Sequence, residues 1–260
     1  MDITYGRYLK IPELLSLQQP VGEPREHDEM LFIVIHQVYE LWFRQQLHEG
    51  DRLGDLLERA DWDHAHATLH RMLKILKTMV AQIDVLETMT PISFLQFRAF
   101  LQSASGFQSW QFRAFEMMLG AKEPRAVTRS PQGSAERLEL ERRLAAPSLW
   151  MRFLRGLVAA GVQVPASSLH RDPALPPEPD PALQPVLLQL YRNQGPIHHL
   201  CESLVDLDEG VQEWRYRHVK MVERTIGAKP GTGGSAGVAY LRSTLFKPLF
   251  PDLWDLRSQL

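Results

Sequence analysis

The most apolar stretch of the chain is residues 30–43, where apolar side chains occupy every position except those of His36, Gln37 and Glu40. Acidic residues at positions 26–29 precede it and suit the positive end of a helix dipole. A helix that is apolar on every side is normally buried, and this one is shorter than the roughly 20 apolar residues that span a bilayer. The pattern therefore predicts a core helix that carries His36 into the interior, with Phe32 on the same face one turn earlier.

The three-and-four spacing of apolar residues predicts two further long helices, at about 63–87 and 200–226, the second ending at Gly227. The same spacing and N-capping residues predict shorter helices near 110–119, 135–144, 149–158 and 238–246. Repeats are absent and β-strand patterns are scarce, so we expect an all-α protein.

Proline-containing segments divide the chain without splitting its core. Two prolines separate an N-terminal arm, residues 1–25, from the central helix, and the Pro- and acid-rich segment 172–185 reads as an exposed connector. It closes an irregular excursion, residues 121–185. Because the helices on either side of the excursion have strongly apolar faces that need partners, we expect residues 1–260 to form a single domain.

Composition narrows the functional classes. A hydrophobic content of 44%, a charged content of 23% and a net charge of −2 are those of an ordinary globular protein, with no expected nucleic-acid or membrane partner. The single cysteine, Cys201, excludes an intramolecular disulfide and a cysteine-rich metal site. The first residues do not resemble a secretory signal, so we expect a cytoplasmic protein.

Two features that resemble ligand sites are better explained otherwise. His64, His66 and His70 lie at the polar start of a predicted helix without a carboxylate or thiol at metal-ligand spacing, so we expect surface histidines. The Gly-rich segment 228–241 has no GK[ST] ending and follows no strand, which excludes a phosphate-binding P-loop. It reads instead as a loop whose hydroxyl, Thr232, is able to fold over a ligand.

Three candidate residues carry charge or an imidazole into apolar surroundings. Arg98 follows Phe94 by one turn and needs an anion, either a distant acidic side chain or the carboxylate of a ligand. His218 lies on the inward stripe of the helix predicted at 200–226, with basic residues around it. This arrangement suits a haem-iron ligand with propionates nearby, although a structural core histidine is the alternative for both His218 and His36.

Taken together, the sequence blocks resemble the tryptophan 2,3-dioxygenase family of haem enzymes, in the family's order and over nearly the whole chain. The blocks are TYGRYL, EHDEMLFIVIHQVYELWF, FRAFLQSASGFQSWQFR, LCESLVDLDEGVQEWRYRHVKMVERTIG and GTGGSAGVAYL. The resemblance implies a helical domain that binds haem b, whose ferrous iron binds O2, and a homotetramer. It also implies oxidative cleavage of the indole C2–C3 bond of L-tryptophan to N-formylkynurenine.

For the cofactor side of the site, the resemblance implies that His218, in WRYRH, is the axial ligand of the haem iron. Ser105 and Gly106 match the haem-pocket segment SGFQS. His36 matches the distal histidine near the indole N–H, where it acts either as a base or as an orienting group, and Phe32 flanks the indole.

For the substrate, the resemblance implies that Arg98 pairs with the amino-acid carboxylate, which supplies the missing anion. Thr232 matches the loop threonine that contacts the substrate's ammonium and carboxylate groups, and Phe94 stands where some bacterial members have tyrosine. Tyr5 and Tyr8 match tyrosines that reach into the pocket of a neighbouring subunit.

One departure from the family pattern keeps other reactions open. The loop reads Lys-Pro-Gly-Thr at 229–232, where Lys-Arg-Gly-Thr is commoner. The alternative is a haem-dependent monooxygenase that converts tryptophan or a β-substituted tryptophan to a 2-oxindole in natural-product biosynthesis. A haem-binding sensor or carrier without turnover is a further alternative.

Overall fold

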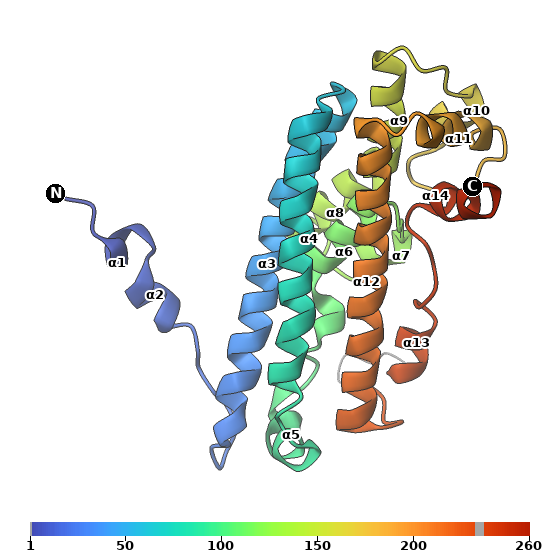
Figure 1. Ribbon diagram of the computed structural model, residues 1–260. Helices are drawn as coiled ribbons and strands as arrows, with labels where there is room; N and C mark the ends of the chain where they lie inside the picture. The colour runs from blue at the N-terminus through green and yellow to red at the C-terminus, as the bar shows by residue number, and fades with distance from the viewer. Residues whose placement is uncertain (1, 232–236) are drawn as a thin grey trace.

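Three long helices stand side by side and form the body of the protein (Figure 1). The computed structural model describes residues 2–231 and 237–260. The long helices are α3 (His27–Glu58), α4 (Trp62–Leu86) and α12 (Pro196–Ile226). The predictions of one continuous helix through the central stretch and of two further long helices are confirmed.

The long helices differ in direction. A short turn, residues 59–61, joins α3 to α4, so these two helices are antiparallel. The ammonium of Lys77 lies 2.5 Å from the Glu213 carboxylate, and the guanidinium of Arg217 lies 2.5 Å from Asp84. Because both partners advance in the same sense along the chain, α4 and α12 are parallel.

The shorter helices lie in the N-terminal arm or cover the ends and one side of this body. They are α1 (Tyr5–Tyr8), α2 (Ile11–Leu15), α5 (Pro91–Arg98), α6 (Trp110–Leu119), α7 (Pro124–Val127), α8 (Ala135–Ala145), α9 (Leu149–Ala159), α10 (Ala166–Leu169), α11 (Gln184–Arg192), α13 (Val238–Arg242) and α14 (Pro251–Leu256). The described residues also form 3-10 turns at η1 (Ala99–Leu101), η2 (Gly106–Gln108) and η3 (Arg257–Gln259). Residues 2–231 and 237–260 contain no strand, which confirms the all-α prediction.

The central helix is buried on one side only. Met30, Val34 and Leu41 are exposed, whereas Ile35 and Phe43 belong to the core. The expectation that this helix is buried all round is therefore wrong for its outer face. The physical reason is that its neighbours α4, α5, α6 and α9 leave that face uncovered within one chain.

The N-terminal arm, residues 2–25, stands away from the bundle (Figure 1). None of the described residues of α1 and α2 is buried. The arm is held at its base, where the Glu29 carboxylate accepts hydrogen bonds from the backbone N–H groups of Val21 at 2.8 Å and Gly22 at 3.0 Å. Glu29 is itself buried, so this end of the arm is fixed to α3.

The excursion is tied to the bundle through α9. Ser148 caps α9 as predicted, its hydroxyl accepting a hydrogen bond from the Met151 N–H. A Cβ atom on Gly156 would lie 1.9 Å from the carbonyl oxygen of Leu57. Only glycine therefore permits α9 to approach α3 so closely.

The C-terminal segment departs from prediction at one point. The helix predicted at 238–246 ends at Arg242. Phe246 has a positive φ of 58° and is 88% exposed, whereas Phe250 is fully buried.

None of the helices in the described part of the chain has the length and the apolar character that a membrane span requires.

Candidate functional site

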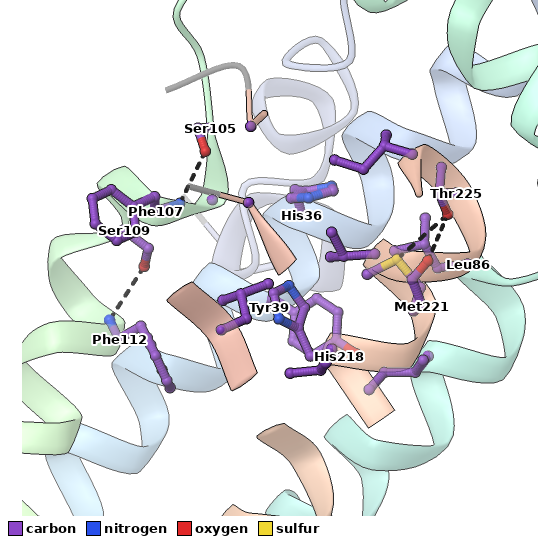
Figure 2. Close-up of a pocket in the computed structure, with 18 of the residues that line it drawn as sticks. His36, Tyr39, Leu86, Ser105, Phe107, Ser109, Phe112, His218, Met221 and Thr225 are labelled. Atoms are coloured by element: carbon purple, nitrogen blue, oxygen red, sulfur yellow. Dashed lines mark hydrogen bonds between the residues drawn. The ribbon is translucent and has the colours of Figure 1, made fainter. Parts of the chain in front are cut away.

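A largely apolar cavity of about 240 Å³ lies at the end of the bundle where α3 begins and α12 ends. Its walls come from α3, α4, α5, α6, α12 and α13 and from loop residues that include those near 104–109, 231 and 237. Figure 2 shows His36 from α3 and His218 from α12 on opposite sides of this space. Residues far apart in the sequence therefore meet here.

The hydrogen bond of His36 determines which of its nitrogens faces a ligand. Its Nδ1 lies 2.7 Å from the carbonyl oxygen of Phe32. A carbonyl can only accept, so Nδ1 carries the proton and Nε2 of the neutral ring is an acceptor. Burial lowers the pKa of His36, against smaller raising effects of the Phe32 carbonyl and Glu40. The imidazole is therefore neutral at pH 7 and presents an unprotonated Nε2.

Three phenylalanines form an aromatic wall beside His36. The ring of Phe32 lies 4.1 Å from the imidazole, 5.8 Å from Phe94 and 5.5 Å from Phe97, measured between centroids. Phe97 is fully buried and fixes the other two rings, whereas Phe32 and Phe94 line the cavity. This wall provides a flat apolar surface on which an aromatic ligand can stack.

Arg98 stands at the rim of the aromatic wall. Its side chain is only half-buried, and its Nη2 donates a hydrogen bond of 2.7 Å to the carbonyl oxygen of Pro230. The expectation that Arg98 is carried into apolar surroundings is thus correct only in part, because the side chain lies at the rim of the cavity. Because the carbonyl is neutral, it does not compensate the guanidinium charge. Arg98 can therefore pair with an anion that enters the cavity.

His218 projects from α12 into the apolar space. Its ring stacks on Trp214 with centroids 5.2 Å apart and planes 7° from parallel. Burial lowers the pKa of His218 to about 4, with smaller contributions from His36 and Arg113. Among residues 2–231 and 237–260, its ring nitrogens have no hydrogen-bond partner. A neutral imidazole with a free lone pair is what a metal ion requires of a histidine ligand.

A buried charge cluster lies in the same wall. The Glu116 carboxylate accepts hydrogen bonds from Arg113 at 2.5 Å and from Arg215 at 2.6 Å, and all three side chains are buried. The Nε atoms of both arginines have no partner in the described part of the chain. Two cations therefore face one anion, and the excess positive charge favours an anionic group in the cavity.

The small-residue segment closes another side of the cavity. The Ser105 hydroxyl accepts a hydrogen bond of 3.3 Å from the Phe107 N–H, and the Ser109 hydroxyl accepts one of 3.2 Å from the Phe112 N–H (Figure 2). Ser105 thus caps the 3-10 turn η2, and Ser109 caps the helix α6. Ser105 and Gly106 line the cavity as predicted residues of the site.

The amino-acid sequence of this chain is similar to one family model and to several known proteins that share a name. A family model described as tryptophan 2,3-dioxygenase matches residues 1–143 and 181–260. The chain is 55% identical over 258 residues to tryptophan 2,3-dioxygenase of Herpetosiphon aurantiacus, covering 99% of this chain and 98% of the relative. It is 56% identical over 258 residues to that of Anaeromyxobacter dehalogenans, covering 99% and 96%.

The chain belongs to the tryptophan 2,3-dioxygenase family. A more distant relative of the same name, from Caulobacter vibrioides, is 43% identical over 265 residues and is covered over 99% of its length. The family model omits residues 144–180, which lie within the excursion and include α9 and α10. The segments that line the cavity all fall within the matched residues.

Most site residues expected from the resemblance to tryptophan 2,3-dioxygenases meet in the cavity. These are Phe32, His36, Phe94, Arg98, Ser105, Gly106 and His218. Tyr5 and Tyr8 lie on the arm and are 77% and 75% exposed. Thr232 lies outside the described residues. In the described part of the chain, no group of three or more His, Cys, Asp or Glu side chains could bind a metal ion.

Of the basic residues around His218, Arg215 lines the cavity and Arg217 does not. Arg217 pairs with Asp84 on α4 and with Glu87, the residue that follows α4, so it is not free for a ligand in the cavity. Arg113 and Glu116, which do line the cavity, were not predicted. An i, i+3 charge pair inside the otherwise apolar α6 is a signal that could have identified them.

Proposed function

We propose that this tryptophan 2,3-dioxygenase family member cleaves the indole C2–C3 bond of L-tryptophan with O2 to give N-formylkynurenine. The observation that carries the proposal is the facing pair of neutral imidazoles, His36 and His218, in one apolar cavity with Arg98 at its rim. The names of the relatives, tryptophan 2,3-dioxygenase, agree with this reading.

The residues present fit a haem b group. His218 offers an imidazole with no protein hydrogen-bond partner in the described part of the chain, and the surrounding wall is apolar. The excess positive charge of Arg113 and Arg215 over Glu116 suits the carboxylates of a haem. When bound, a haem supplies the ferrous iron that activates O2, chemistry that protein side chains lack.

The protein's own residues bind and orient the substrate. Phe32 and Phe94 offer a surface for the indole ring, and Arg98 pairs with the carboxylate of tryptophan after releasing the Pro230 carbonyl. The unprotonated Nε2 of His36 accepts a hydrogen bond from the indole N–H, because Nδ1 is committed to Phe32. We assign Thr232 a contact with the amino-acid group of the substrate, by analogy with the family.

The proposal also includes the association of several copies of this chain. We propose a homotetramer in the cytoplasm, in which Tyr5 and Tyr8 of one chain reach the cavity of a neighbour. Their exposure in the single chain supports this, since apolar and aromatic side chains gathered on an extended arm are commonly buried by association.

We expect His36→Ala to lower kcat by roughly 2- to 12-fold, the value of one neutral hydrogen bond of about 0.5–1.5 kcal/mol. His36→Gln, whose amide oxygen accepts a hydrogen bond but is no base at neutral pH, should retain more turnover than the alanine variant. Steady-state oxygen consumption measures both. Equal losses of about 100-fold or more in the two variants would instead identify His36 as an obligate base.

We expect Arg98→Leu to lower kcat/KM for L-tryptophan by roughly 10- to 100-fold, since a hydrogen bond to a charged group contributes about 1.5–3 kcal/mol. Tryptamine, which has no carboxylate, is the matched control substrate. The leucine variant should bind tryptamine as well as the wild type does. A similar loss with both substrates would contradict the pairing of Arg98 with the carboxylate.

Product mass tests the proposed reaction itself. The purified protein is loaded with haem, reduced without oxygen, and then mixed with L-tryptophan and O2. A product heavier by two oxygen atoms, both derived from 18O2, is expected. Addition of a single oxygen would indicate a 2-oxindole-forming monooxygenase, and a haem spectrum without oxygen consumption would indicate a sensor or carrier.

A further inference from the structure

The orientation of the His218 imidazole rests on packing. Histidines that bind a metal usually donate the second ring nitrogen to a carboxylate or a carbonyl, which fixes the ring. In residues 2–231 and 237–260 no such acceptor meets His218. What the ring has instead is Trp214, one turn earlier on α12, at 5.2 Å and nearly parallel to it.

Trp214 is itself clamped from two other helices. Its ring lies 4.9 Å from Phe112 of α6, and 6.1 Å from Phe43 and 6.2 Å from Tyr39, both of α3. The contacts with Phe43 and Tyr39 are edge-on, so these rings form a frame around the indole. An indole held in this way cannot rotate without displacing core side chains.

Tyr39 anchors the frame to a third long helix. Its hydroxyl donates a hydrogen bond of 2.7 Å to the carbonyl oxygen of Met79 on α4. Burial raises the pKa of Tyr39 to about 12, so the phenol keeps its proton and this bond at neutral pH. Tyr39 and His218 both line the cavity, and both are labelled in Figure 2.

We propose that Trp214, held in place by Tyr39, is the positioning residue that sets the plane of the His218 imidazole and aims its lone pair into the cavity. The proposal rests on the haem site proposed above. Trp214 acts through stacking, and Tyr39 acts through Trp214, so neither needs to touch the substrate. Loss of the indole should leave His218 free to turn about its side-chain bonds.

The test compares two buried tryptophans in the haem-loaded protein. Trp150 is the matched control, because it is also buried and stacked on a phenylalanine, Phe153, but lies outside the cavity. Haem loss to an excess of apomyoglobin and the iron–histidine vibration of the reduced protein are measured for W214L and W150L. We expect W214L to lose haem about 10- to 100-fold faster, the usual effect of removing a partner that orients a ligand.

The vibration separates positioning from general destabilisation. In W214L we expect the iron–histidine band to shift or broaden, with KM for tryptophan near that of the wild type, whereas W150L keeps the wild-type band and haem-loss rate. Wild-type behaviour in W214L, or equal changes in both variants, overturns the proposal. Should W214L fail to fold, W214F and W150F are compared by the same criteria. A wild-type protein that binds no haem would refute the proposed function instead.

Discussion

Replacement of His218 by alanine is expected to abolish stable haem binding while the helical bundle stays folded. His218 is the imidazole in the cavity wall that has no described hydrogen-bond partner, and burial keeps it neutral and able to bind iron. The haem-to-protein ratio and the absorption spectrum of the purified variant measure the effect. Far-UV circular dichroism should match that of the wild type, because the side chain removed ties no helices together by hydrogen bonds.

Two controls make this result specific. His199→Ala removes an exposed histidine from the same helix, α12, and should leave the haem spectrum unchanged. Free imidazole, which fits the space left in the His218→Ala variant, should restore part of the haem binding. A normal haem spectrum in His218→Ala without added imidazole would show that the ligand has been assigned wrongly.

The second large effect is expected on stability, in Glu116→Ala. The substitution leaves Arg113 and Arg215 buried without their shared anion. Removing one partner of a buried ion pair costs about 3–5 kcal/mol in free energy of unfolding. Urea denaturation of the haem-free protein measures this cost, since an absent cofactor cannot offset it.

Glu213→Ala is the matched control for Glu116→Ala. Glu213 pairs with Lys77 on the surface between α4 and α12, and surface pairs contribute about 0–1 kcal/mol. An equal and small loss of stability in the two variants would show that the buried cluster relaxes by admitting water. Glu116→Gln should lie between the wild type and the alanine variant because its amide oxygen still accepts one hydrogen bond.

The local spacing of apolar residues was sufficient to predict where the helices lie, but not which of their faces are buried by other parts of the chain. The spacing of apolar residues predicted α4 and α12 to within a few residues, and Gly227 marked the end of α12, where its φ is 61°. The same pattern overestimated the burial of α3 and the length of the helix after 238. Both errors concern which surfaces meet, and that depends on residues distant in sequence.

In the site, too, contacts within one helix could be predicted from the sequence, whereas contacts between distant segments could not. Phe32 and His36 share a helix face, so their contact followed from a spacing of four residues. The placement of His36 and His218 in one cavity did not follow from any spacing. It was expected only from the resemblance to a family. The partners of the basic residues around His218 could not be predicted either, because they lie on α6, on α4 and directly after α4.

The distance in sequence between the two sides of the cavity has a consequence for biosynthesis. The ribosome delivers α3, with His36, early and α12, with His218, near the end of the chain. Synthesis proceeds at roughly 5–20 residues per second, so α3 and α4 leave the ribosome several seconds before α12 is complete. The partial bundle of α3 and α4 then exposes the apolar surface that α12 later covers. On the proposed assignment of His218 as the haem ligand, the site that holds the cofactor is complete only after α12 has been made.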